Sequence, residues 1–473
     1  MNLKQRVFQK EDPKQYQQKD IHLTRTLRTR DLLALGVGTI VSTAIFTLPG
    51  VVAAQYTGPA VSLSFLLSAV VAALIAFVYA EMAAVMPFAG SAYTWIRILF
   101  GEGLGWLVGW ALIAEYTIAI AFVASGFSAN LRGLMASFNL SLPASLSQPM
   151  GSEGGVIDLI AAISMILTAI LLSRGASETS RVQNVLVVLK VMAILLFVVV
   201  GATAIHLDNY IPFLPEYNPD SEGTLGGWQG IYAGSAVIFI SYIGFDSLAA
   251  NSAEAINPGK TMPRGILGSL VIAVSLFIIV SLVLVGMFHY TAYEGNAEPV
   301  GWALRNSGHP VVGVIVQAIS VFGMFTALVG MMLAGSRLIY SFGRDGIFPK
   351  WVGQLNRKFL PNRALLIVTI VAVIVGSMFP FDFLAELMSA GTLVAFMFVT
   401  LGLFSLRRRE GKDLPVPSFK FPLYPVLPII TFICIFAIFW GLSGEAKFYT
   451  GVWFILGIIY YAFYLIRTRH RTV

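Results

Sequence analysis

The 473-residue chain has few charged side chains and a single cysteine. Charged residues make up 12% of the sequence, about half the fraction usual in soluble proteins, whereas hydrophobic residues make up 57%. The single cysteine, Cys434, lies in an apolar run, so a disulfide framework and a cysteine metal site are both excluded. These deficits exclude an ordinary soluble domain and predict a polytopic membrane protein.

Motifs for nucleotide binding and for common enzyme chemistry are also missing. The chain lacks a Walker sequence and any polar stretch long enough to fold into a nucleotide-binding domain, which excludes a self-contained ATP-driven pump. No Ser–His–Asp or metal-ligand constellation stands out, and none of the histidines lies in the middle of an apolar window. The sequence therefore does not indicate an enzyme, and we expect no cofactor and no nucleic-acid partner.

Windows of about 20 apolar residues, the length that a bilayer requires, recur along the chain. They lie near 32–54, 60–85, 103–131, 156–172, 180–205, 230–255, 265–288, 310–340, 364–380, 383–406, 423–442 and 448–466. We therefore predict an all-α polytopic membrane protein with twelve transmembrane helices.

Lysine and arginine residues are unevenly divided between the two sets of loops. If both termini lie on one side of the membrane, that side holds a basic tail at 1–30, the segment 337–363 and a basic loop at 407–422. The opposite loops then hold few positive charges, namely Arg132, Arg305 and Lys447. Because positively charged loops stay on the inner side, we predict that both termini are cytoplasmic.

Two apolar windows are interrupted by glycines and hydroxyl side chains, at 36–46 and at 236–255. In lipid, an interrupted helix is tolerated only where it lines a cavity, because the freed N–H and C=O groups need partners. Two such breaks at the start of two five-span halves indicate an inverted repeat with a binding site at the bilayer midplane. The predicted division is repeat 1 at 31–206, an outer loop at 207–228, repeat 2 at 229–406, and two extra helices with a cytoplasmic tail at 423–473.

The two breaks suggest the chemistry of the ligand. The first break, Ser42-Thr43-Ala44, offers backbone N–H groups and the positive end of a helix dipole, which can bind a carboxylate. The second break, near 240–243, leaves carbonyl oxygens that can bind an ammonium group. This pairing predicts an α-amino acid site. The alternative is that the small residues merely allow close helix packing, but two breaks in matched positions favour the site.

Lys190 lies deep inside the fifth window. A charged lysine at the bilayer centre costs about 2.5–3.5 kcal/mol, and deprotonating a lysine at pH 7 costs about 4–5 kcal/mol. Because the two costs are similar, local contacts decide the protonation state, as a proton-coupling group requires. Lys190 could also supply a fixed positive charge in place of a sodium ion. The alternative, a side chain that snorkels to the interface, suits its depth poorly.

Glu115 lies in the middle of the third window and is the strongest acidic candidate for a site or a proton relay. Its alternative role is a structural hydrogen bond to a broken backbone. Asp246 and Glu386 are further acids inside apolar windows. Glu81 and Glu254 lie near cytoplasmic ends, where interfacial solvation or gating pairs with basic loop residues suit them.

The interrupted stretch at 36–46 and four other motifs resemble the amino acid–polyamine–organocation superfamily over the whole chain. The other motifs lie at 87–93, 109–116, 242–246 and 344–346. Within the superfamily the chain is similar to the cationic amino acid transporter group and to bacterial branched-chain amino acid permeases. The stretches that carry this similarity are 34–40, 249–255 and 405–409.

The resemblance implies a leucine-transporter-type fold of five plus five helices in an inverted repeat, alternating access and proton-coupled uptake without sodium. It also implies a bacterial plasma membrane location, with the lipid bilayer and either a small accessory membrane subunit or none as partners. It makes Lys190 the match to a fifth-helix lysine that replaces sodium, and Glu115 the match to a third-helix acid near the substrate.

The resemblance further assigns the two ends of the substrate. It places carboxylate recognition on Thr43 and Ala44, with Ile40 nearby. It places amine recognition on Ile240 and on the neighbouring break residues Ser241 and Ile243.

Two departures from the family pattern bear on specificity. Ser42-Thr43-Ala44 stands where the family has Gly-x-Gly, and Ile240 stands where an aromatic gate is common. The resulting pocket is aliphatic, formed by Ile40, Ile118, Ile240 and Met331. It fits Leu, Ile, Val and Met, with loose selectivity because one methylene contributes only about 1–3 kcal/mol.

Four alternatives to a proton-coupled neutral amino acid symporter stay open at this stage. A carrier for Arg and Lys would need a carboxylate at the far end of the pocket, for which Glu115 is available. An exchanger of two amino acids is the second alternative. A sensor on a transporter scaffold would need a large signalling extension, which we do not expect here, and a channel would need polar rings along a pore, whereas these breaks share one depth.

Overall fold

The computed structural model describes residues 7–8, 10–13, 25–88, 90–152, 154–174, 180–219, 223–356 and 360–469. Its α-helices are α3 (Thr29–Ile40), α4 (Ala44–Val52), α5 (Val61–Val85), α6 (Ser91–Phe100), α7 (Glu102–Ala136), α8 (Ala144–Ser147), α9 (Leu159–Ser173), α10 (Ser180–Ala202), α11 (Gly227–Ile238), α12 (Phe245–Ala250), α13 (Pro258–Met287), α14 (Pro299–Asn306), α15 (Pro310–Arg344), α16 (Asn362–Met378), α17 (Phe381–Arg409), α18 (Val426–Trp440) and α19 (Gly444–Arg469). A π-helical turn, η1 (Ala53–Thr57), follows α4, and the 3₁₀ turns are η2 (Gly58–Ala60), η3 (Leu207–Tyr210), η4 (Phe239–Tyr242), η5 (Ser252–Glu254) and η6 (Tyr290–Tyr293).

The described residues form helices and turns, with β-structure limited to isolated bridges. In this part of the chain, eight helical segments are long and apolar enough to cross a membrane, and α9, α16 and α18 are shorter apolar helices. Each apolar window predicted from the sequence coincides with a helix or with a pair of consecutive helices. The all-helical, multi-pass membrane architecture is therefore confirmed, and the number of twelve crossings stays a prediction.

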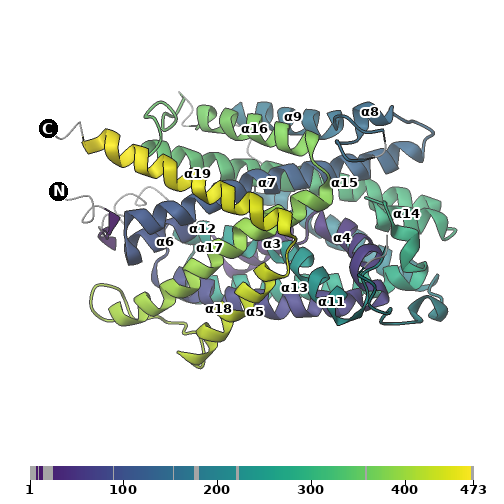
Figure 1. Cartoon of the computed structure of the whole chain (residues 1–473), viewed down its shortest axis with the longest axis horizontal. Helices are drawn as coiled ribbons and strands as arrows, with labels where there is room; N and C mark the ends of the chain where they lie inside the picture. The colour runs from purple at the N-terminus through teal and green to yellow at the C-terminus, as the bar shows by residue number, and fades with distance from the viewer. Residues whose placement is uncertain are drawn as a thin grey trace.

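The long helices run along the long axis of the molecule, with α6 and the end of α19 at one end and α8 and α14 at the other (Figure 1). The N-terminal segment packs with Phe8 against Gly101, at the start of α7. Tyr461 of α19 donates a hydrogen bond to Glu102 at the same place. The two ends of the described chain therefore lie at the same end of the bundle, as an even number of crossings requires.

Burial distinguishes the central helices from the peripheral ones. The apolar window of α7 is 89% buried by other parts of the chain, whereas that of α19 is only 22% buried. A helix that is apolar all round and buried belongs to the core of a large membrane protein, and an apolar helix with exposed faces meets lipid. α7 therefore stands at the centre of the bundle, and α19 belongs to its lipid-facing surface.

Besides the four-residue α8, two helices lie in segments that the sequence analysis left as loops. α6 falls between the second and third windows, and α14 falls in the loop between the seventh and eighth. Both are short, and α14 begins with Pro299, a residue that suits the first position of a helix. Pro299 packs against Gly50 of α4, so α14 contacts the second half of the first interrupted helix.

Candidate substrate site at the two helix breaks

The first interrupted helix breaks at residues 41–43, as the sequence predicted. The Val41 N–H donates to the Val37 carbonyl at 2.9 Å, which closes α3, and α4 begins at Ala44. Thr43 has helical backbone angles (φ −62°, ψ −39°) and Ala44 is the first residue of α4, so a residue with a side chain fits at Ala44, where the family pattern has glycine. The first N–H groups of α4 lack acceptors from a preceding turn, and the positive end of its dipole faces the break.

The second interrupted helix breaks between α11 and α12. After the 3₁₀ turn η4, Ile243 is extended (φ −65°, ψ 139°) and Gly244 has a φ of +128°. A side chain at that φ is strained, so this position requires glycine. The chain leaves the helical path here, and carbonyl groups at the end of α11 and η4 lose their usual helical donors.

The two breaks touch one another. A Cβ atom added to Gly244 would lie 3.2 Å from the Ile40 backbone nitrogen and 3.2 Å from the Thr39 carbonyl carbon. The Thr39 hydroxyl also donates to the Gly244 carbonyl at 3.4 Å. The end of α3 and the start of α12 are therefore held at one depth in the bundle, which is compatible with a site between the two breaks.

Several buried polar atoms in the two breaks and on α7 and α17, which pack beside them, have no hydrogen-bond partner in the described part of the chain. They are Thr43 Oγ1, Ser241 Oγ, Glu115 Oε2 and Ser389 Oγ. Each of these side chains is at most 1% exposed. A buried polar group left without a partner costs about 1–3 kcal/mol, so such a cluster is stabilised when a polar ligand supplies the missing bonds.

Glu115 of α7 and Asp246 of α12 form a buried carboxyl pair. The two carboxyl groups adjoin one another, and Thr392 of α17, whose hydroxyl donates to the Met388 carbonyl at 3.0 Å, adjoins Glu115. Two adjoining buried carboxylates repel one another, which favours a proton on one of the two. Asp246 Oδ1 also accepts the Gly244 N–H at 2.9 Å, so the pair is attached to the second break.

Lys190 points into the bundle and contacts the first interrupted helix. Its Nζ donates to the Gly38 carbonyl of α3 at 3.1 Å, and the side chain is 2% exposed. A Cβ atom on Gly323 of α15 would lie 2.7 Å from Lys190 Cε, so the absence of a side chain there makes room for the lysine. The alternative of a snorkelling lysine is therefore wrong.

The predicted aliphatic residues are all buried. Ile40 ends α3, Ile240 lies in η4 with Ile243 just after it, and Ile118 lies one turn from Glu115 on α7. Met331 lies one turn before Gly335, the glycine of α15 that faces α7. The breaks and α7 thus bring these side chains to one region, and Met331 lies on the α15 face directed towards it.

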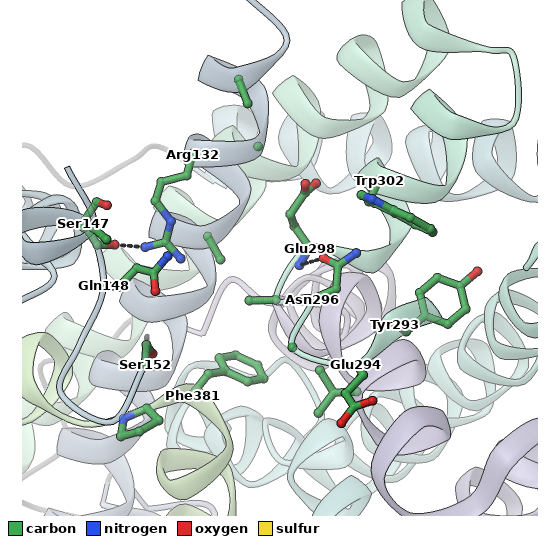
Figure 2. Close-up of a pocket in the computed structure, with 18 of the residues that line it drawn as sticks. Arg132, Ser147, Gln148, Ser152, Tyr293, Glu294, Asn296, Glu298, Trp302 and Phe381 are labelled. Atoms are coloured by element: carbon green, nitrogen blue, oxygen red, sulfur yellow. Dashed lines mark hydrogen bonds between the residues drawn. The ribbon is translucent and has the colours of Figure 1, made fainter. Parts of the chain in front are cut away.

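A pocket of about 960 Å³ opens at the end of the bundle where α4, α7, α14 and α17 meet. Figure 2 shows Arg132 and Gln148 on one side of it, Glu298 and Trp302 on the other, and Phe381 between them. Two of its charged groups are paired: Arg132 pairs with Asp158 at 3.3 Å, and Glu298 pairs with Arg305 and accepts from Gln317 at 2.5 Å. This pattern suits an entrance better than a binding site.

The wall residue Glu298 lies in the loop before α14. Burial raises the pKa of its carboxyl group, and the hydrogen bonds from Arg305 and Gln317 oppose that shift. These bonds bind α14 to α15.

The opposite end of the bundle is closed by ion pairs. Arg97 of α6 bonds to Glu11 at 2.6 Å, to Asp345 at 3.1 Å and to Glu102 at 3.8 Å. This cluster joins the N-terminal segment, α6, α7 and the end of α15. The bundle therefore has an open pocket at one end and is closed by ion pairs at the other.

Two interrupted helices that meet at their breaks, beside unpartnered polar atoms, are typical of a membrane transporter. Comparison with known proteins gives the family. Residues 27–464 match the model of the amino acid permease family, and the chain belongs to that family. Its activity is amino acid transport.

Three relatives show the range of the family. The chain is 58% identical to the branched-chain amino acid permease BcaP of Lactococcus lactis subsp. cremoris, over 96% of this chain and 98% of the relative. It is 36% identical to the methylthioribose transporter of Bacillus subtilis, over 95% of each protein. It is 34% identical to the vacuolar cationic amino acid transporter 4 of Arabidopsis thaliana, over 84% of this chain and 65% of that protein.

Sequence analysis missed two features of the site. Asp246 was recognised as an intramembrane acid, but its contact with Glu115 depends on how α7 and α12 pack and leaves no local pattern. Ser389 was not singled out, because a serine inside an apolar helix usually bonds to its own backbone. Its spacing of three residues from Thr392 on α17 was the only available indication.

Proposed function

We propose that this protein is a proton-coupled symporter that carries branched-chain and related neutral amino acids into a bacterial cell by alternating access. The observation that carries the proposal is the meeting of the two breaks beside Thr43 and Ser241, whose hydroxyl groups are buried and unpartnered. The N–H groups at the start of α4 and Thr43 Oγ1 bind the substrate carboxylate. The carbonyl groups of the second break and Ser241 Oγ bind its ammonium group.

The side-chain pocket follows from the buried aliphatic residues. Ile118, Ile240 and Ile243 present only hydrocarbon to the substrate side chain, which suits Leu, Ile, Val and Met. An Arg or Lys substrate would need an unpaired acid at this position. Glu115 and Asp246 are the acids available for this role, so transport of cationic amino acids is the second candidate function. The 34% identity to a cationic amino acid transporter supports this second candidate.

Proton coupling rests on the two titratable groups at the breaks. Lys190 supplies a cation beside α3 without a sodium ion, and Glu115 shares a proton with Asp246 beside α12. Binding of a carboxylate or an ammonium group nearby changes the balance of charge around each group. Protons are therefore the expected coupling ions, and an exchange mode without net proton movement is the alternative.

The arrangement of the breaks supports a five-plus-five inverted repeat, in which α3–α4 corresponds to α11–α12. We place the end with the open pocket outside and the Arg97 end, together with both termini, in the cytoplasm. The structure then corresponds to a state closed towards the cytoplasm. Transport requires the Arg97 ion pairs to break while the outer end closes.

The test uses purified protein in potassium-loaded liposomes with an inward proton gradient and no sodium. Radiolabelled leucine uptake is measured with unlabelled Ile, Val, Met, Ala, Arg and Lys as competitors. We expect uptake that an uncoupler abolishes and that the branched aliphatic amino acids block. Block mainly by Arg or Lys would overturn the neutral assignment, and uptake insensitive to the uncoupler would overturn proton coupling.

A matched pair of variants tests the site itself. Thr43→Val keeps the shape of the side chain and removes the unpartnered hydroxyl, so leucine affinity should fall. Thr47→Val removes a hydroxyl one turn further along α4 that already bonds to the Thr43 carbonyl at 3.2 Å. Equal effects of the two substitutions would exclude Thr43 from the site.

A further inference from the structure

We propose that a second pocket, at the end of the bundle that the Arg97 ion pairs close, binds the phosphate headgroup of an anionic phospholipid. The pocket has a volume of about 300 Å³ and lies between Phe100, the last residue of α6, and the last turns of α17. It shares no lining residue with the open pocket at the other end. The proposal therefore adds a lipid site to the proposed transport function and does not depend on which amino acid is carried.

The α17 side of this pocket is apolar at one level and basic at the next. Leu401 and Phe404 line the apolar level, and Arg408 and Arg409 line the basic level one to two turns further along the helix. Lys10 of the N-terminal segment adds a third basic side chain, and no acid belongs to the lining in the described part of the chain. The pocket therefore joins hydrocarbon to positive charge, as an anionic lipid requires.

The order of residues along α17 matches the order of groups in a phospholipid. Leu401, Phe404 and Arg408 lie on one face of the helix, because residues three, four and seven positions apart share a face. Leu401 and Arg408 are separated by about 10 Å along the helix axis. Leu401 is 40% exposed, and an apolar side chain exposed on a membrane-spanning helix meets acyl chains. The exposed Arg408 then lies at the level of the phosphate group above those chains.

Contacts between α17 and the end of α6 fix the wall of the pocket. The Ser405 hydroxyl donates to the Leu99 carbonyl at 3.3 Å, and Arg409 Nη1 donates to the Ile98 carbonyl at 2.6 Å. Both acceptors lie in the last turn of α6, where carbonyl groups have no donors within their own helix. The protein therefore sets the shape of the pocket before a lipid binds.

The charges around the pocket leave Arg408 available for an anion. Asp413 accepts a hydrogen bond from Arg409 Nε at 2.9 Å and interacts electrostatically with Lys10. Arg408 has no hydrogen bond or ion pair with any residue that the structure describes. A guanidinium group binds phosphate through two parallel N–H···O bonds. Arg408 therefore offers these donors to a phosphate in the pocket, and Lys10 offers a second positive charge.

A lipid accounts for both levels of the pocket, whereas a free phosphate would use only the basic level. Basic pockets between transmembrane helices recognise anionic headgroups, and each basic residue near the membrane surface raises the affinity by about fivefold. Arg408 and Lys10 together therefore predict a preference of about 25-fold for an anionic over a zwitterionic phospholipid.

The test measures lipid binding to the purified, delipidated protein in detergent by native mass spectrometry. Phosphatidylglycerol and phosphatidylcholine with identical acyl chains are added separately, and the ratio of their dissociation constants is determined for the first lipid bound. We expect phosphatidylglycerol to bind about 25-fold more tightly to the parent and about fivefold more tightly to Arg408→Gln. Arg408→Lys keeps the charge and should stay close to the parent. Equal affinities of the two lipids for the parent would overturn the proposal.

The matched control is Arg264→Gln, which removes an exposed arginine near the start of α13 and outside the pocket. This start lies at the same end of the bundle, because Ser418, in the loop after α17, donates to the Gly259 carbonyl at 3.0 Å. Equal losses of preference in Arg408→Gln and Arg264→Gln would refute the site. If Arg408→Gln does not fold, Lys10→Gln removes the other exposed cation of the lining and is held to the same comparison.

A soluble competitor separates a lipid from a free phosphate compound. Glycerol phosphate has the phosphate chemistry of the headgroup and no acyl chains, so at the concentration of the lipid it should leave phosphatidylglycerol bound. Full displacement would overturn the lipid assignment and assign the pocket to a soluble phosphate compound. None of these measurements uses leucine, so failure of the proposed transport function would leave their results unchanged.

Discussion

Replacing Lys190 by methionine should abolish proton-driven accumulation while the protein stays folded. Methionine keeps most of the length of the side chain and removes its charge together with the bond from Nζ to the Gly38 carbonyl. Removing a charge from the bilayer centre relieves about 2.5–3.5 kcal/mol, and losing a hydrogen bond to a charged group costs about 1.5–3 kcal/mol. The free energy of unfolding should therefore change by no more than about 2 kcal/mol.

The expected loss of coupling is large by comparison. An inward gradient of one pH unit supplies about 1.4 kcal/mol per proton, which supports up to about tenfold accumulation of leucine when one proton is carried. The Lys190→Met protein should only equilibrate leucine across the membrane, while counterflow exchange continues in part. Thermal unfolding in detergent and accumulation in liposomes are measured on the same preparation.

The control is Lys260→Met, which removes an exposed lysine at the start of α13 and should leave accumulation unchanged. Full driven accumulation by Lys190→Met would show that Lys190 is not the coupling group. A loss of both accumulation and exchange, with an unchanged melting temperature, would assign it to substrate binding instead.

Three further substitutions test the packing around the breaks. Gly126→Ala places a methyl group onto Thr43 Cγ2 and should impair leucine uptake. Thr43→Ser removes the Cγ2 methyl group, so the double variant should regain uptake. Uptake that stays impaired in the double variant would contradict the contact. Gly323→Ala pushes on Lys190 Cε and should weaken proton-driven accumulation more than counterflow, so an equal loss of both would argue against this explanation. Ile240→Phe should narrow the range of competing amino acids in liposome uptake, and an unchanged competition profile would remove Ile240 from the pocket.

The breaks could be predicted because their residues conflict with the demands of the bilayer. A sequence of glycines and hydroxyl side chains at 36–46 is costly in a continuous transmembrane helix, so its presence indicates a local interruption. For Glu81 the sequence left interfacial solvation and a pair with a basic loop residue open, because the acid lies near a cytoplasmic end. The structure supplies Arg407, at 2.8 Å, from the predicted basic loop.

Features that depend on packing between distant segments could not be predicted. Phe122 and Phe381 are ordinary residues of apolar windows, and nothing local indicates that their rings meet across 259 positions of chain. α6 and α14 escaped notice because their polar residues lower the mean hydropathy of a 20-residue window, although each is a well-formed short helix. Hydropathy finds the helices that lipid requires and misses those that the protein itself stabilises.

The two breaks carry opposite titratable groups, and this gives the proposed coupling its physical basis. At the first break a base, Lys190, donates to a carbonyl oxygen of α3, and at the second break an acid, Asp246, accepts the Gly244 N–H before α12. Each group satisfies a backbone atom that the interruption has freed. A substrate carboxylate and ammonium group bring the same two charges to the same depth of the bundle. A change of protonation at Lys190 or at the Glu115–Asp246 pair therefore alters the hydrogen bonds and charges available to the freed backbone groups of each break. Because substrate binding alters the same interactions, proton binding and substrate binding are thermodynamically linked.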